Sequence, residues 1–294
     1  MADYVLSCCS TTDVTREFLD ERNIKYVAFN YNLDGQNCKD DFGQTNSPAQ
    51  LYAKMLAGAS ATTSQVSVGE YIEHFGKLLE QGTDVLHVTL SSGISGTYNS
   101  ACTAAQQLAE THPEHKVVVV DSLCASAGYG LLMDRLADLR AGGMGIDELA
   151  AWTKAHRLEV QHWFFSTDLT FFIRGGRISK AAGLVGGLLK ICPVMDVEPD
   201  GSLAVKEKIR NKKNAIDRDL QKMEELAAGG RNYTGKCFIS HSECLSDARE
   251  VASRVEKEFP HLNGPVEIYD IGATIGCHTG PGTVALFFWG SPRA

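Results

Sequence analysis

Residues 84–97 read DVLHVTLSSGISGT, an apolar run followed by a short segment of serine and glycine. The apolar run predicts a strand buried on both faces, and the Ala-rich segment 97–110 predicts a helix. HKVVVVD at 115–121 predicts a second buried strand, and helices are expected over 126–141 and 146–157. Buried strands that alternate with helices indicate a parallel sheet covered on both faces, the doubly wound α/β architecture.

The chain beyond residue 158 has the pattern of a second α/β unit. Strands are expected at 160–167, 202–209, 235–241 and 265–270 and after a turn that starts at His278, and helices at 211–228 and 246–259. We therefore expect two α/β domains, 1–157 and 158–294, with a soft boundary because no Pro- or Ser-rich linker separates them. The interface between two such domains is a common place for a ligand site.

The composition excludes several classes of protein. Of the 294 residues, 44% are hydrophobic and 22% are charged, which excludes global disorder. The net charge of -8 argues against nucleic-acid binding, which needs a basic surface. The sequence has no apolar run of transmembrane length and no secretory signal, so we expect a cytoplasmic protein without permanent membrane insertion.

Nine cysteines are scattered along the chain, and none of them forms a C-x-x-C pair. An odd number without that spacing argues against structural zinc and against a thioredoxin-type motif. We expect free, mostly buried thiols and no metal site.

Basic residues concentrate in one stretch of the chain. Residues 172–220 contain ten Lys/Arg and six Asp/Glu, whereas the rest of the chain carries a net charge of -12. Two interpretations remain open, a solvated helix face or a docking surface for an acidic or phosphorylated partner.

The Ser- and Gly-rich segment 91–96 lies between the first of these strands and its helix. Free backbone N–H groups and the helix dipole favour an anion at such a place. The segment is not a G-x-S-x-G nucleophile elbow, because Thr97 replaces the second glycine, and it lacks the Gly-Lys-Ser/Thr of a Walker A loop. We expect it to bind an anionic group, with capping of the helix by Ser95 or Thr97 as the alternative.

Three further segments carry polar groups that suit an anionic ligand. The hydroxyls of 62–64 precede a helix expected from about Val68, where helix capping is the alternative. His278 stands in a Gly-rich stretch, although a lone histidine is more often structural than functional. In RGGRI at 174–178 the glycines allow close backbone approach and the arginines offer forked donors. Because no acid/base pair is visible, these groups suit recognition of a carboxyl group better than catalysis.

Together these segments resemble the DegV family of bacterial fatty-acid-binding proteins. The resemblance covers essentially the whole chain, and the matching strings occur in the family's order. They are TTSQ at 62–65, with Val66 in place of the usual proline, SSGISGTY at 91–98, RGGRI at 174–178, GLLK at 187–190 with Pro193, and HTGPGT at 278–283.

The resemblance implies a carrier rather than an enzyme. Family members hold a long-chain fatty acid in a tunnel between two α/β domains, and a partner kinase phosphorylates the bound acid for phospholipid synthesis. Here the tunnel walls would lie among the apolar residues of 163–191, with the fatty acid as ligand and no other cofactor. Arg174 and Arg177 would contact the kinase or the transferred phosphoryl group. The resemblance assigns carboxylate binding to Thr62, Thr63, Ser64, Ser92, Gly93, Ser95, Gly96, His278 and Thr279.

One departure from the family and two other functions remain. Cys9-Ser10-Thr11 stands where family members carry Asp-Ser-Thr, so the acidic side chain of that turn is missing, although Asp13 is near. A transferase that uses the same anion-binding loop is one alternative, but it would need an acid/base pair. A regulatory lipid sensor is the other, and the sequence does not separate it from a carrier.

Overall fold

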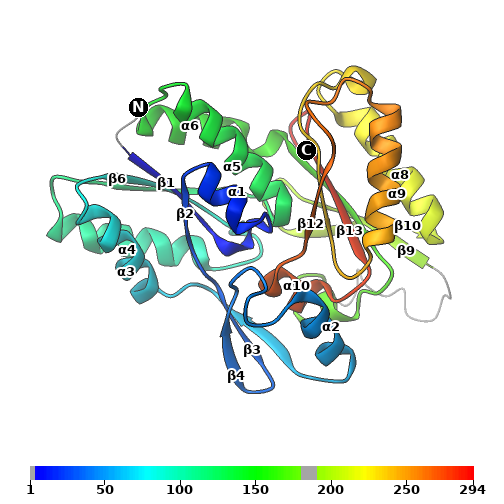
Figure 1. Cartoon of the computed structure of the whole chain (residues 1–294), viewed down its shortest axis with the longest axis horizontal. Helices are drawn as coiled ribbons and strands as arrows, with labels where there is room; N and C mark the ends of the chain where they lie inside the picture. The colour runs from blue at the N-terminus through cyan, green and yellow to red at the C-terminus, as the bar shows by residue number, and fades with distance from the viewer. Residues whose placement is uncertain (1–3, 180–190) are drawn as a thin grey trace.

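The computed structural model describes residues 4–179 and 191–294 of the chain. Within these ranges the strands form a four-stranded, a six-stranded and a three-stranded sheet, with helices packed against them (Figure 1).

A parallel sheet forms the core of the N-terminal half. Its elements are β1 (Tyr4–Cys9), β2 (Ile24–Val27), β6 (Asp84–Thr89) and β7 (Val117–Asp121), with helices α1 (Arg16–Glu21), α3 (Val68–Leu79), α4 (Thr97–Thr111), α5 (Ser126–Ala141) and α6 (Ile146–His156). The strands pair in the order β2-β1-β6-β7, all parallel. Helices α3 and α4 cover one face, and α1, α5 and α6 lie on the other (Figure 1). The expected doubly covered parallel sheet is confirmed.

A mixed sheet forms the core of the C-terminal half. Its elements are β8 (Val160–Ser166), β9 (Ile191–Val197), β10 (Leu203–Arg210), β11 (Phe238–His241), β12 (Glu267–Asp270) and β13 (Thr283–Trp289), with helices α7 (Thr170–Arg174), α8 (Lys212–Leu226), α9 (Leu245–Glu258) and α10 (Ala273–Thr279). The order is β10-β9-β8-β13-β11-β12, antiparallel except for the parallel pair β11 and β12. The expected strands and helices form here, but β9, α7 and α10 were not among them. His278 therefore lies in a helix, and the expected turn begins only at Gly280, whose φ is 62°.

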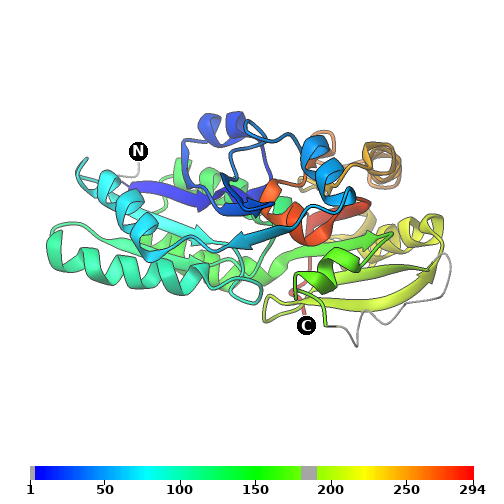
Figure 2. The ribbon, with the colours of Figure 1, turned by 90° about the horizontal axis from the view of Figure 1, so that it is seen from below.

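A small antiparallel sheet packs beside α10. It consists of β3 (Asn30–Leu33), β4 (Gln36–Lys39) and β5 (Ala61–Ser64), and α2 (Pro48–Leu56) lies between β4 and β5 in the chain. Asp34 and Gly35 join β3 to β4 with φ of 51° and 83°, which suits a two-residue hairpin turn. Tyr31, Leu51 and Cys277 belong to the apolar cluster that packs β3, α2 and α10 together (Figure 2).

Helix α5 joins the two halves. Most of its residues are buried, because it contacts α6 on one side and β8, β11 and β13 on the other. Gly128 makes this approach possible, since a Cβ there would lie 2.3 Å from Nε2 of His162 and 2.6 Å from Cδ1 of Phe287. The boundary between 157 and 158 falls just after α6 and stays a prediction.

Arg293 fixes the β9–β10 hairpin to the N-terminal half. Its buried guanidinium donates to the carbonyls of Val197 and Glu198 at the end of β9. It also donates to the carbonyls of Leu123 and Arg157, which belong to the N-terminal half. Five N–H donors in a rigid plane suit arginine to such backbone bridging. The hairpin is thereby held over the cavity described next.

Candidate functional site

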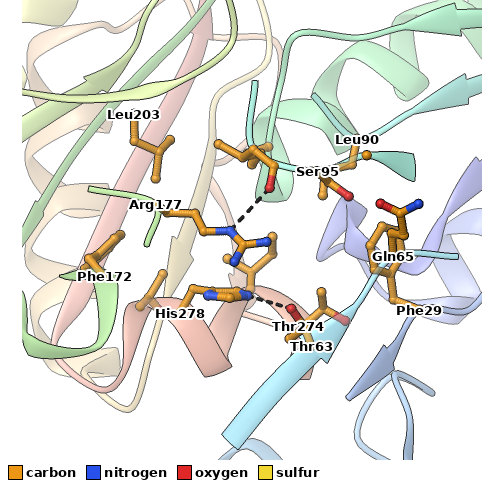
Figure 3. Close-up of a pocket in the computed structure, with 15 residues that line it drawn as sticks. Phe29, Thr63, Gln65, Leu90, Ser95, Phe172, Arg177, Leu203, Thr274 and His278 are labelled. Carbon is orange, nitrogen blue, oxygen red and sulfur yellow. Dashed lines mark hydrogen bonds between the residues drawn. The ribbon is translucent and has the colours of Figure 1, made fainter. Parts of the chain in front are cut away.

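A cavity of about 230 Å³ lies where the two halves and the three-stranded sheet meet (Figure 3). Its wall takes residues from β5, from the loop 91–96, from the segment after α7, and from α10. Polar side chains gather at one end of it, and three of them come from segments that lie far apart in the sequence. They are Thr63, Arg177 and His278.

Thr63 and His278 form a hydrogen bond within the wall. The Oγ1 atom of Thr63 lies 2.7 Å from Nε2 of His278 (Figure 3). Because side chains alternate along a strand, Thr63 turns inward while Thr62 and Ser64 are exposed. The helix cap expected as an alternative at 62–64 is supplied instead by Ser67, which forms a capping box with Glu70.

The imidazole of His278 is neutral near pH 7. Burial, and secondarily the nearby Arg177, lower the pKa of His278 to about 4. The ring reaches this place because residue 175 is glycine, since a Cβ on Gly175 would lie 2.2 Å from Nδ1 of His278. A neutral imidazole that has a hydroxyl neighbour can donate a hydrogen bond to an anion.

Arg177 brings a positive charge to the same end of the cavity. Its Nη1 donates to the carbonyl of Gly175 at 2.7 Å. Its Nε donates to the carbonyl of Ile94 at 3.3 Å (Figure 3). Within residues 4–179 and 191–294 no carboxylate forms an ion pair with it. Burial lowers the pKa of Arg177, which remains positively charged. A half-buried guanidinium without a carboxylate partner favours an anion beside it.

The loop 91–96 places the start of α4 at the cavity. Gly96 is the N-cap residue and has no side chain to cap the helix, so the capping alternative is met only in part, by Ser95 at the first backbone N–H of α4. Ser95 and Gly96 line the cavity, and Oγ of Ser95 accepts a hydrogen bond from the backbone N of Thr97 at 3.3 Å. Gly93 packs on the β9–β10 turn instead, since a Cβ there would lie 2.3 Å from the carbonyl carbon of Gly201.

An apolar cavity of about 50 Å³ continues from the polar one. The two share five wall residues, which are Ala125, Phe172, Leu203, Ile275 and Thr279. Beyond these residues the smaller cavity runs between α5 and the six-stranded sheet, where Phe164 belongs to its wall. A polar end with an apolar continuation matches a ligand that has a charged head and a hydrocarbon chain. Of the expected wall residues 163–191, those at 180–190 lie outside the described residues.

The structure gathers some of the expected residues and leaves others apart. Those that line the cavity are Thr63, Ser95, Gly96, His278, Thr279 and Arg177. Those that do not line it are Thr62, Ser64, Ser92, Gly93 and Arg174. Arg174 is exposed and its guanidinium lies 5.3 Å from the ring centre of Phe171. The binding roles of all these residues stay predictions.

Sequence reasoning did not assign the wall residues Gln65 and Phe29. Gln65 donates from Nε2 to Oγ of Ser100 at 2.8 Å, which ties β5 to α4 beside Gly96. Gln65 ends the TTSQ string, so its neighbours were already marked. The Asp34-Gly35 pair is a strong hairpin signal and could have indicated β3, which begins directly after Phe29.

Three further observations bear on the chemistry of the chain. All nine cysteines are free, and Cys38, Cys102 and Cys244 are the ones not fully buried. Among the described residues no group of three or more His, Cys, Asp or Glu is placed to hold a metal ion. No helix within the same residues has the length and apolar character needed to cross a membrane.

Comparisons with known proteins agree with this geometry. A family model described as an uncharacterised protein of the DegV family matches residues 9–290. A DegV domain-containing protein of Clostridium perfringens is 32% identical over 293 residues, which are 100% of this chain and 99% of that protein.

Two solved structures are similar over nearly the whole chain. A DegV family protein of Thermus thermophilus, described as binding fatty acid, has a TM-score of 0.86 at 25% identity and covers 98% of this chain and 99% of its own. The B3 protein of the Streptococcus pneumoniae fatty acid kinase, loaded with linoleic acid, has a TM-score of 0.83 at 21% identity, with 98% and 99% covered. The second likeness is one of fold.

Proposed function

Because the chain belongs to the DegV family, we propose that it binds one long-chain fatty acid and presents the carboxyl group to a partner kinase. The observation that carries the proposal is the cavity with Thr63, His278 and Arg177 at one end and an apolar continuation at the other. The binding of fatty acid by the similar Thermus thermophilus protein supports the same ligand class.

The energetics favour such a ligand. Each buried methylene contributes about 0.8 kcal/mol, so a long acyl chain supplies most of the binding free energy. The carboxylate then needs hydrogen-bond donors and one positive charge, which Thr63, His278 and Arg177 provide in this arrangement. A carrier of this kind would hold its lipid through purification.

The position of the polar end suits presentation to a second protein. Ser92 and Gly93, in the same loop as Ser95, are exposed, and so is Gln65 in the cavity wall. A carboxylate bound at this end would therefore lie near the protein surface. Exposed Arg174 belongs to the helix that precedes Arg177, and we assign it to the kinase contact.

Lipid extraction and mass spectrometry test the ligand. We expect freshly purified protein to release a long-chain fatty acid in a one-to-one ratio, and the delipidated protein to take up palmitate or oleate. Protein that carries no acyl chain and takes up neither fatty acid would contradict the proposal.

Phosphorylation of the bound acid tests the partner. With ATP and a bacterial fatty acid kinase subunit, we expect acyl-phosphate to form, and Arg174→Glu to slow its formation without weakening fatty-acid binding. Arg16→Glu is a matched control, because Arg16 is an exposed cation in α1, outside the cavity wall. If both variants slow acyl-phosphate formation equally, Arg174 is not part of the kinase contact. If the protein binds fatty acid but no acyl-phosphate forms, a lipid sensor is the better description.

A further inference from the structure

The three-stranded sheet holds α10 at both ends. Near its C-terminal end, His278 of α10 bonds to Thr63 of β5. At its N-terminal end, the carboxylate of Asp40, the residue after β4, accepts hydrogen bonds from the backbone N of Ala273 and of Thr274, both at 3.2 Å. One sheet therefore contacts the helix through two polar side chains, one on β5 and one directly after β4.

Asp40 supplies a cap that the helix does not provide for itself. The N-cap residue of α10 is Gly272, which has no side chain to offer its own helix. Asp40 lies 233 residues away in sequence, and only 2% of it is exposed. Burial raises the pKa of Asp40, and the side chain of Thr274 together with the backbone N–H groups of Thr274 and Ala273 opposes that effect.

Residue 272 has to be small for this contact. A Cβ on Gly272 would lie 2.7 Å from Oδ1 of Asp13 and 3.4 Å from Oδ1 of Asp40. Asp13 is held in turn by Oγ of Ser126, the first residue of α5. The start of α10 is thereby fixed against both the small sheet and the helix that joins the two halves.

We propose that Asp40 is a positioning residue for the bound carboxylate, which acts by setting the place of α10 and so of His278. The inference rests on the proposed fatty-acid function. Because α10 is a short helix with a glycine N-cap, loss of the Asp40 bonds leaves its N-terminal end without a side-chain cap. The helix then shifts, and His278 leaves its hydrogen bond with Thr63.

Fatty-acid affinity in two backgrounds tests this route. Asp40→Asn keeps the shape of the side chain but turns an amide NH2 towards one of the two backbone donors. We expect it to weaken oleate binding about ten-fold in the natural sequence and by less than two-fold in a His278→Ala background. The matched control is Asp41→Asn, because Asp41 accepts from Thr45 and, within the part of the chain that the structure describes, forms no hydrogen bond with α10. An equal ten-fold loss in both backgrounds would overturn the proposal.

A readout without ligand separates this proposal from the function on which it rests. In an NMR titration of the ligand-free protein, we expect Asp40→Asn to raise the pKa of His278 from about 4 towards its ordinary value, because the ring becomes exposed. Ala273→Pro is a second variant that removes one donor at the first helical position, where proline is tolerated, and we expect the same direction. If both variants are folded and the pKa of His278 is unchanged in them, the role of Asp40 is overturned, whether or not oleate binds.

Discussion

Oγ1 of Thr63 lies 2.7 Å from Nε2 of His278, although 215 residues separate them in the chain. Thr63 belongs to β5 of the three-stranded sheet. His278 belongs to α10, which lies between β12 and β13 of the six-stranded sheet in the chain. The polar end of the cavity therefore exists only when segments from both halves are packed together. Ligand affinity should report on that packing.

The Thr63–His278 pair gives the first prediction. Thr63→Val and His278→Ala should each weaken oleate binding about ten- to a hundred-fold, because each removes a hydrogen-bond donor to the charged carboxylate. The double variant should lose less than the product of the two single effects, because both groups serve one carboxylate. Dissociation constants for the four proteins of this cycle decide the matter. Strictly multiplicative losses would indicate independent sites.

The closeness of Gly175 to His278 gives a second prediction. In Gly175→Ala the added methyl group would lie 2.2 Å from Nδ1 of His278, so the ring has to move. We expect about 1–3 kcal/mol less stability and weaker oleate binding. Gly69→Ala is the control, because nothing lies within 4 Å of a Cβ there and the position is in the exposed surface of α3. That control should gain about 0.5–1 kcal/mol, and a similar gain in Gly175→Ala would contradict the packing described.

Acid should destabilise the protein through its buried histidines. Burial lowers the pKa of both His278 and His74 from 6.5 to about 4. Between these values the unfolded chain binds protons that the folded protein does not, so the free energy of unfolding falls as the pH drops from about 6.5 to about 4. The contribution is fully present above pH 6.5. Urea unfolding at a series of pH values measures this dependence. Between pH 4 and 6.5 the free energy of unfolding should change less steeply with pH in His278→Gln than in the natural protein.

A control separates this effect from the loss of any histidine. His261 is exposed, so His261→Gln changes the same side chain without opening the cavity wall. If both variants change the pH dependence of the free energy of unfolding equally, burial of His278 is not its source.

The parallel sheet could be predicted because its signal is local. The apolar runs 84–90 and 115–121 became β6 and β7, and the helices between and after them formed where expected. The loop 91–96 followed directly, since its place between a strand and a helix fixes it at the carboxyl edge of the sheet. Ser95 and Gly96 accordingly line the cavity.

The rest of the site depends on contacts that no local pattern encodes. β5 is four residues long, pairs with β3 and packs against α10. The sequence left both a ligand site and a helix cap open for the hydroxyls at 62–64, and it did not show that only Thr63 turns inward. The resemblance marked Arg177 as a contact for the kinase or the transferred phosphoryl group, which stays a prediction, but no local pattern showed that its guanidinium reaches Ile94 in the other half of the chain. Asp40 was not marked at all, because the two backbone N–H groups of α10 that its carboxylate accepts from lie 233 and 234 residues away.

Arg177 gives the last prediction, because its charge faces the cavity without a carboxylate partner among the described residues. If the guanidinium faces the bound head group, Arg177→Met should weaken oleate binding about ten- to a hundred-fold, the range for a lost hydrogen bond to a charged group. Binding of oleyl alcohol should change little, because its head group carries no charge. The oleate affinity of Arg177→Lys should lie between those of the natural protein and Arg177→Met, since lysine keeps the charge but not the planar fork. Isothermal titration of both ligands against the three proteins measures this.

If Arg177→Met binds oleate normally but its bound oleate is no longer phosphorylated, the residue acts on the kinase or the phosphoryl group instead. If oleate and oleyl alcohol lose affinity equally, Arg177 shapes the cavity and its charge plays no part in binding.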